Sequence, residues 1–316
     1  MNKINLMDKI NATTLMLVTS EWSAIKARRI RNNYSSAPTF IYDNHLMDLE
    51  FVDILEQNVR FARSVSENKQ TLVLLNPFPQ SILAYQPIWQ NLTQHFDVWA
   101  YDLPGFGGSS GGKECMSFQA QGTYLRAFIE HFQLQGVHLV APDIGMPAVL
   151  DYVGRQQHNV KSIMVGDGPA FSPSQNGSVI DKMVTSRFWR RVFIIAGSGA
   201  LIEAGNRLGY VNYTPNEEEI SDYKTSYQNR IPATLKWFED YPSSLANIEP
   251  LLKKVNVPTK IFWGRNDGIL LAEMADDLRK IIPDSEVHIF ENCGHFSYQD
   301  QAGEFLDMVI EWVNKH

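Results

Sequence analysis

The chain has 316 residues, a formal net charge of −7, 44% hydrophobic residues and 20% charged residues. These proportions are typical of a globular protein whose core is large enough to fold without metals or disulfides. The acidic balance argues against a broad nucleic-acid surface, and the sequence has no run of the ~20 apolar residues that would cross a bilayer. Two cysteines, Cys115 and Cys293, do not make a disulfide framework, so we expect a protein of the reducing cytoplasm.

Residues 1–36 are expected to form a helical extension that packs on the main domain. Apolar residues recur there at roughly helical spacing until residues 32–38, rich in Asn, Ser and Pro, break the pattern. The extension contains a basic cluster between Lys26 and Arg31. We interpret this cluster as a solvated helix face, with an anionic partner as the alternative.

Beyond the extension, strand and helix patterns alternate along the chain. Two strand-like segments at 45–54 and 59–65 precede an apolar run at 71–75, the kind of run that suits a strand buried on both faces of a parallel sheet. Further strands are predicted at 96–101, 137–140, 161–165, 260–263 and 286–290. Helices are predicted near 81–94, 118–132, 146–155, 272–282 and 302–314.

This alternation predicts an α/β protein with a doubly wound, mostly parallel sheet. It stops between residues 169 and 249, where the composition is helical and rich in Tyr, Trp and Arg. We therefore expect a core domain made of residues 37–168 and 250–316, with residues 169–249 inserted as a helical cap.

A candidate nucleophile stands where one predicted strand turns into a helix. The strand at 137–140 runs into Ala141-Pro142-Asp143-Ile144-Gly145. A sharp strand-to-helix turn needs small residues two before and two after its apex, and it presents the apex side chain at the edge of the sheet. The helix that follows favours negative charge at its start. The pattern therefore points to Asp143 as an exposed nucleophile, although an aspartate that caps a helix would look the same.

Two more polar residues follow later strands. Asp267 comes after the strand at 260–263, and His295 comes after the strand at 286–290. The carboxyl ends of parallel strands share one edge of a sheet, so we expect both side chains to lie near Asp143. The order nucleophile, acid, histidine is the order of the α/β-hydrolase fold.

Other segments extend this likeness. The segment NPFPQS from Asn76 to Ser81 resembles an H-G-x-P loop, and YDLPGFGGS from Tyr101 to Ser109 resembles a D-x-x-G-x-G-x-S turn. With the aspartate at the turn, the chain resembles the branch of the α/β-hydrolase superfamily that contains epoxide hydrolases and haloalkane or fluoroacetate dehalogenases. The cap segment 217–238 is similar to the helix that carries the epoxide-protonating tyrosine in that branch, and in this register the tyrosine is Tyr223.

The resemblance implies a two-step reaction. A carboxylate, Asp143, attacks a saturated carbon and forms an alkyl ester, which is then hydrolysed by a water that His295 deprotonates. Asp267 would orient His295. The backbone N–H groups of Phe78 and Ile144 would stabilise the tetrahedral oxyanion.

The chain departs from the branch in several places. Asn76-Pro77 replaces His-Gly, and Pro142 replaces the histidine before the nucleophile. Because Pro77 and Pro79 flank Phe78, the loop is stiff, and the sequence allows a cis Phe78–Pro79 bond. Ile144 follows the aspartate where dehalogenases have Trp or Arg, so a halide would need another donor, for which Asn76 is the candidate.

The first cap helix also departs from the branch, because its stretch 187–193 lacks Tyr and His. Trp189, Arg190 or Arg191 would take their place and point into the site. A buried arginine there would favour an anionic substrate. The alternative is that the two arginines lie on the surface of the cap.

Several functions remain open at this level. Epoxide hydrolysis leads, followed by carbon–halogen hydrolysis and by a specialised biosynthetic hydrolysis. A relative without catalysis that binds a ligand is the alternative of another class. Cys293 and the loop serines Ser81 and Ser109 are poorer nucleophile candidates, since none occupies a strand-to-helix turn. We expect a small-molecule substrate, no cofactor, no metal, and no nucleic-acid or membrane partner, and the sequence leaves a homodimer open.

Overall fold

The computed structural model describes residues 3–19, 47–66, 69–156, 159–172, 178 and 180–316. The basic cluster between Lys26 and Arg31 lies outside the described residues. None of the helices in the described part of the chain is both long and apolar enough to cross a bilayer.

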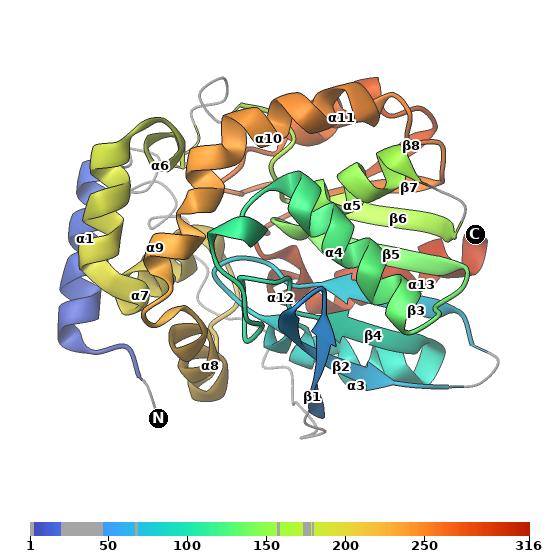
Figure 1. Ribbon diagram of the computed structural model, residues 1–316, viewed down its shortest axis with the longest axis horizontal. Coiled ribbons are helices and arrows are strands. Elements are labelled where there is room, and N and C mark those ends of the chain that lie inside the picture. The colour runs from blue at the N-terminus through green and yellow to red at the C-terminus, as the bar shows by residue number, and fades with distance from the viewer. Residues whose placement is uncertain (1–2, 20–46, 67–68, 157–158, 173–177, 179) are drawn as a thin grey trace.

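An eight-stranded sheet in the order β1-β2-β4-β3-β5-β6-β7-β8 forms the centre of the protein (Figure 1). The pairs β1–β2 and β2–β4 are antiparallel and all other neighbours are parallel. The strands are β1 (Leu49–Ile54), β2 (Gln57–Ser64), β3 (Thr71–Leu75), β4 (Asp97–Tyr101), β5 (Val137–Pro142), β6 (Val160–Gly166), β7 (Thr259–Gly264) and β8 (Ser285–Phe290). The doubly wound, mostly parallel sheet predicted from the alternation is confirmed.

Helices cover both faces of the sheet. On one face α4 and α5 pack together, and on the other α3 packs against α13 (Figure 1). These core helices and their short neighbours are η1 (Ile82–Tyr85), α3 (Gln86–His95), η2 (Lys113–Cys115), α4 (Phe118–His131), α5 (Gly145–Arg155), α11 (Glu273–Ile281), α12 (Ser297–Asp300) and α13 (Ala302–Lys315). Every residue of β5 is buried, as expected for a strand whose two faces are covered by helices.

The chain leaves the sheet after β6 and returns to it at β7. Between them lie the helices α6 (Asp181–Thr185), α7 (Arg187–Gly209), α8 (Glu217–Tyr227), α9 (Ile231–Thr234) and α10 (Lys236–Leu252). Helix α7 is kinked at Gly197, whose φ of 84° is a conformation that side chains with a Cβ rarely adopt. This helical insertion sits beside the sheet in Figure 1.

The N-terminal helix α1 (Leu6–Thr19) packs against α7 of this insertion. The sequence suggested that the extension would pack on the main domain, and this expectation is corrected. The buried face of α1 presents Ala12, Leu15 and Met16, which recur at the spacing of one helix face. In Figure 1 the two helices lie side by side at the end of the molecule away from the sheet.

Candidate active site

Asp143 lies at the apex of the turn that joins β5 to α5. Its φ is 46°, a left-handed conformation that aspartate tolerates better than most residues. The Asp143 N–H donates to the Gly166 carbonyl at the end of β6, at 2.9 Å, and the Met146 N–H donates back to the Asp143 carbonyl at 3.0 Å, which closes a tight turn. A Cβ at Gly145 would come within 2.9 Å of the Leu75 side chain and 3.3 Å of Ala141. The small residues that the sequence places on either side of the apex are therefore needed for packing.

The turn brings Asp143 to the two residues that the sequence placed at the same edge of the sheet. His295 Nδ1 lies 2.8 Å from Asp267 Oδ2, and His295 Nε2 lies 3.7 Å from Asp143 Oδ1. The second distance is too long for a hydrogen bond, so Nε2 faces the nucleophile without being tied to it. The other Asp267 oxygen accepts from the N–H groups of Ile269 and Leu270 at 2.7 and 3.0 Å. Asp267 is thus fixed where it can orient the imidazole.

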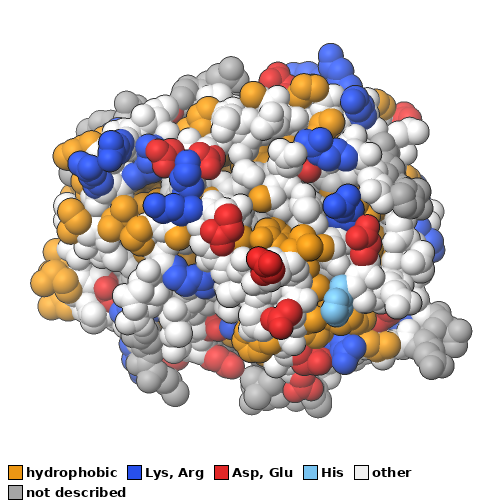
Figure 2. All heavy atoms as spheres, viewed as in Figure 1, with side chains coloured by type: hydrophobic (Ala, Val, Ile, Leu, Met, Phe, Trp, Pro, Cys, Tyr) orange, Lys and Arg blue, Asp and Glu red, His pale blue; other side chains and the backbone are white. Residues whose placement is uncertain are grey.

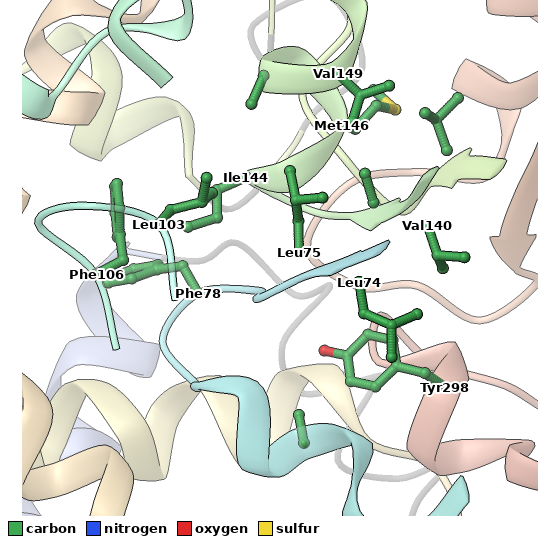
Figure 3. Close-up of a cluster of buried hydrophobic side chains, with 14 of the residues drawn as sticks. Leu74, Leu75, Phe78, Leu103, Phe106, Val140, Ile144, Met146, Val149 and Tyr298 are labelled. Atoms are coloured by element: carbon green, nitrogen blue, oxygen red, sulfur yellow. The ribbon is translucent and has the colours of Figure 1, made fainter. Parts of the chain in front are cut away.

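The loop after β3 supplies the expected backbone donor. The Phe78 N–H donates to Asp143 Oδ2 at 2.6 Å, and the Phe78–Pro79 bond is cis. The two oxygens of Asp143 therefore differ, since one is held by a backbone donor and the other faces His295. Figure 3 shows Phe78, Leu103, Phe106 and Ile144 gathered beside the ends of β3 and β5. Ile144 is the N-cap residue of α5 and lines the same cavity as Asp143.

His295 sits between two carboxylates, and this controls its protonation. Burial by itself lowers the pKa of His295, but the Asp267 and Asp143 carboxylates outweigh burial and raise the pKa well above its ordinary value. In the resting site the two carboxylates therefore favour the imidazolium form of His295. Loss of the Asp143 charge would remove part of this stabilisation and lower the pKa of His295.

Replacing Asp143 with asparagine is expected to lower the pKa of His295, because the amide keeps the shape of the side chain without its charge. The pKa is measured by following the imidazole resonances of His295 by NMR across a pH series. The surface variant Asp277→Asn serves as the control and should leave this titration where it is. A pKa that stays unchanged or rises in Asp143→Asn would mean that the two residues are not electrostatically coupled.

A cavity opens beside Asp143 and His295. Its volume of about 90 Å³ is several times what one bound water needs. Its walls come from α1, α6, α7, α10 and the core loops, and among the described lining residues Asp143 and His295 alone are ionisable at neutral pH. A site of this kind suits an apolar molecule with one reactive group.

The cap residues predicted from the sequence do not reach this cavity. Tyr223 is fully buried within the cap, where its hydroxyl has no hydrogen-bond partner among the described residues. Arg190 donates to the carbonyls of Met183 and Val184 at 3.0 and 2.9 Å, and Arg191 is exposed. Neither arginine lines the cavity. The expectation that they enter the site and bind an anion is therefore corrected.

Two other predicted binding residues also lie elsewhere. Trp189 packs with Phe188 and under the ammonium of Lys182. Asn76 is buried, and its Oδ1 accepts from the Leu103 N–H at 2.7 Å. Asn76 therefore braces the loop that carries Phe78 rather than facing a substrate. Tyr241 of α10, which the sequence did not single out, does line the cavity.

The other nucleophile candidates are engaged in structural contacts. Burial raises the pKa of the Cys293 thiol well above its ordinary value, which disfavours the reactive thiolate. Ser81 donates to Asp222 and caps η1, and Ser109 donates to the Asp102 carbonyl at 2.6 Å. None of the three lines the cavity.

Asp300, a buried carboxylate that the sequence analysis did not single out, ties the histidine loop to the cap. Asp300 accepts from the N–H of Gly294, next to His295, at 2.8 Å. It also accepts from three consecutive N–H groups that follow α7, at distances of 2.7 to 2.9 Å, namely those of Val211, Asn212 and Tyr213. Asp300 follows no predicted strand, so no local pattern marks it.

Asp300→Asn is expected to destabilise the protein by about 2–3 kcal/mol, because an amide NH₂ would face backbone N–H groups that donate to the carboxylate in the wild type. Urea unfolding followed by circular dichroism gives the free energy. Asp277→Asn is the matched control, since Asp277 is half exposed and pairs with Lys280 at 2.8 Å. The control should stay within about 0.5 kcal/mol of the wild type. Equal effects of the two changes would contradict the role given to Asp300.

Comparison with known proteins agrees with this architecture. The profile described as alpha/beta hydrolase fold matches residues 70–302. The chain therefore belongs to the α/β-hydrolase family, and it is a hydrolase of that family by its fold and its relatives.

Its similarity to individual proteins is low. Pimeloyl-[acyl-carrier protein] methyl ester esterase from Vibrio cholerae is 23% identical over 253 residues, which cover 79% of this chain and 97% of the esterase. A putative lipase from Acinetobacter baumannii superimposes with a TM-score of 0.73 at 20% identity, over 93% of this chain and 96% of the lipase. The epoxide hydrolase CorEH superimposes with a TM-score of 0.72 at 18% identity, over 85% of this chain and 99% of that chain. These structural likenesses show a shared fold.

Proposed function

We propose that the protein hydrolyses epoxides through an ester formed on Asp143. The observation that carries the proposal is the aspartate at the strand-to-helix turn, with one oxygen held by the Phe78 N–H at 2.6 Å and the other facing His295 at 3.7 Å. A carboxylate held in this way can attack an electrophilic carbon through its free oxygen.

In the first step Asp143 Oδ1 forms a bond to an epoxide carbon, and the carbon–oxygen bond of the ring breaks. The alkoxide takes a proton from Tyr241. Burial and then the nearby Asp143 carboxylate raise the pKa of Tyr241, so its hydroxyl stays protonated. That hydroxyl donates to the Phe171 carbonyl at 2.6 Å and would turn from it to the alkoxide. Tyr241 takes the role that the sequence assigned to Tyr223.

Formation of the ester removes the Asp143 charge, so in the second step the His295 imidazolium releases its Nε2 proton to solvent. The neutral ring then removes a proton from water, which attacks the ester carbonyl carbon of Asp143. The oxyanion lies on Oδ2, where the Phe78 N–H already binds, and such a donor is typically worth about 3 kcal/mol. Collapse of the tetrahedral intermediate expels the second alkoxide, which takes the proton from His295. The diol leaves, Asp143 retains one oxygen from water, and the remaining carboxyl proton returns to Tyr241.

Hydrolysis of carbon–halogen bonds is the second candidate, and a tryptophan in the cavity favours it. Trp237 lines the same cavity as Asp143, and its indole N–H is a donor that could bind a departing halide. The nucleophile, the histidine and the second step would be the same. Only the leaving group would differ.

The test is the intact mass of His295→Gln after exposure to 1,2-epoxyalkanes and to 1-bromoalkanes. Without the base, the ester should form and persist. A gain of the whole epoxide mass on the peptide that contains Asp143 is the expected result. A gain of the bromoalkane mass less hydrogen bromide would favour dehalogenation instead.

The double variant His295→Gln/Asp143→Asn is the matched control, and it should gain no mass. Adducts that persist in the double variant would come from another residue. A folded His295→Gln that forms no adduct with either compound class would overturn the proposal and would favour a specialised substrate or a ligand-binding protein without catalysis.

A further inference from the structure

The N-terminal helix contributes to the cavity that contains Asp143 and His295. Leu15 and Met16 of α1 are both buried and both line this cavity. Helix α1 lies outside the hydrolase core. It precedes residues 70–302, which match the family, and it lies on the far side of α7 from the sheet (Figure 1). The active-site cavity is therefore closed in part by a segment outside the hydrolase core and outside the inserted cap.

Helix α1 is held in place by more than apolar packing. Asp8 accepts from Lys224 of α8 at 2.6 Å, and both side chains are largely buried. Arg207 of α7 donates to Thr13 at 2.8 Å. A Cβ at Gly199 of α7 would come within 2.4 Å of the Asp8 carboxyl group, so the two helices approach closely at this point. The position of the cavity wall is therefore fixed by contacts to two cap helices.

The chemistry of the cavity defines what can lie against this wall. Among the described residues of α1, α7 and α10 that line the cavity, every side chain is apolar or aromatic. An ionised group placed there would lose its hydration without gaining a partner, which is costly. A neutral alkyl or aryl group would gain free energy from leaving water.

We infer that α1 is a specificity element of the active site, and that the non-reacting end of a neutral, apolar substrate packs against Leu15 and Met16. The inference rests on the proposed function in so far as the reacting end lies at Asp143. The length of the substrate is then set by the side chains of α1. Helix α1 also presents an outward face, where Leu17 is 63% exposed while Leu15 is 2% exposed. Figure 2 shows hydrophobic side chains at this end of the molecule.

The test uses 1-alkanols from about four to ten carbons, which occupy an apolar cavity without reacting. Titration calorimetry on the wild type should show binding that tightens by about fourfold for each added methylene, up to a limiting chain length. Leu15→Trp should shorten this limit and weaken binding of the longest alkanols by at least about tenfold. Leu15→Ala, which enlarges the cavity, should move the limit to a longer chain.

Leu17→Trp is the matched control, because it adds the same side chain to the outer face of the same helix. It should leave the affinities for the alkanols and the limiting chain length unchanged. Circular dichroism establishes that each variant is folded. If Leu15→Trp fails to fold, the role of α1 is tested by Leu15→Ala alone, through the longer limiting alkanol that is expected for this variant. A chain-length limit that is the same in the wild type and in Leu15→Ala would overturn the inference, and so would the absence of chain-length dependence in the wild type.

Alkanol binding requires no chemistry, so its outcome is independent of whether Asp143 forms an ester. Adduct formation in His295→Gln without any effect of position 15 on alkanol binding would reject the role of α1 alone. A shift of the alkanol limit without any adduct would reject the epoxide reaction alone. When the epoxide reaction and the role of α1 are both correct, adduct formation with 1,2-epoxyalkanes should slow beyond a limiting chain length. That length should change in the Leu15 variants in the same direction as the limit for alkanols.

Discussion

Asp143→Asn is expected to lower kcat by at least about 10⁴-fold, the loss that follows removal of the nucleophile from a covalent mechanism. An amide is a far weaker nucleophile than a carboxylate. The fold should be unchanged, because asparagine tolerates the φ of 46° at this position and its amide oxygen can still accept from the Phe78 N–H. The measurement is steady-state hydrolysis of the epoxide that forms the best adduct with His295→Gln.

Asparagine can deamidate to aspartate, so Asp143→Ala is measured beside Asp143→Asn and should show a loss that does not recover with time. Asp181→Asn, an aspartate in the first turn of α6, serves as the control and should retain full activity. Retention of more than about one hundredth of kcat in Asp143→Ala would exclude Asp143 as the nucleophile.

Arg60→Ala is expected to destabilise the protein by about 3–5 kcal/mol, because it leaves two carboxylates without their cation. Arg60 is buried in β2 and lies 2.6 Å from Asp102 and 2.6 Å from Asp222 of α8. Asp102 in turn accepts from the N–H groups of Ile82 and Gly108, both at 2.8 Å. One guanidinium thus joins the sheet, the loop after Phe78 and the cap.

The matched control is Arg63→Ala, three residues further along the same strand. The Arg63 side chain is 40% exposed, against 7% for Arg60, and it pairs with the half-exposed Glu50 at 3.0 Å. Exposed pairs of this kind contribute at most about 1 kcal/mol. Urea unfolding of both variants gives the comparison. A loss in Arg60→Ala no larger than that in Arg63→Ala would show that the buried cluster does not hold the cap to the core.

The strands and the positions of the candidate catalytic residues could be predicted because both depend on local patterns. A strand buried on both faces tends to be an apolar run, as β3 is from Leu72 to Leu75. β5 is also buried throughout, although His138 interrupts its apolar residues. The residues that follow the parallel strands share one edge of the sheet, which is why the sequence alone could place Asp143, Asp267 and His295 together. The acid-to-histidine distance of 2.8 Å agrees with that placement.

The cap could not be predicted in the same way, because its helices are oriented by contacts that are distant in sequence. Residues 217–238 have a helical composition, but no local feature shows which side of α8 faces the cavity. That side is set by Arg60, which binds Asp222, and the result is that Tyr223 is buried away from the cavity. Asp300 and Leu15 were missed for the same reason, since each gains its role from partners far along the chain.

The most direct test of an ester on Asp143 is a single turnover in ¹⁸O-labelled water, with the enzyme in excess over an epoxide. If Asp143 attacks the substrate, the oxygen added to the first diol comes from the carboxylate. The account therefore predicts an unlabelled diol and an ¹⁸O atom in the peptide that contains Asp143. Label in the diol and none in that peptide would mean that water attacks the epoxide directly, and would contradict the account.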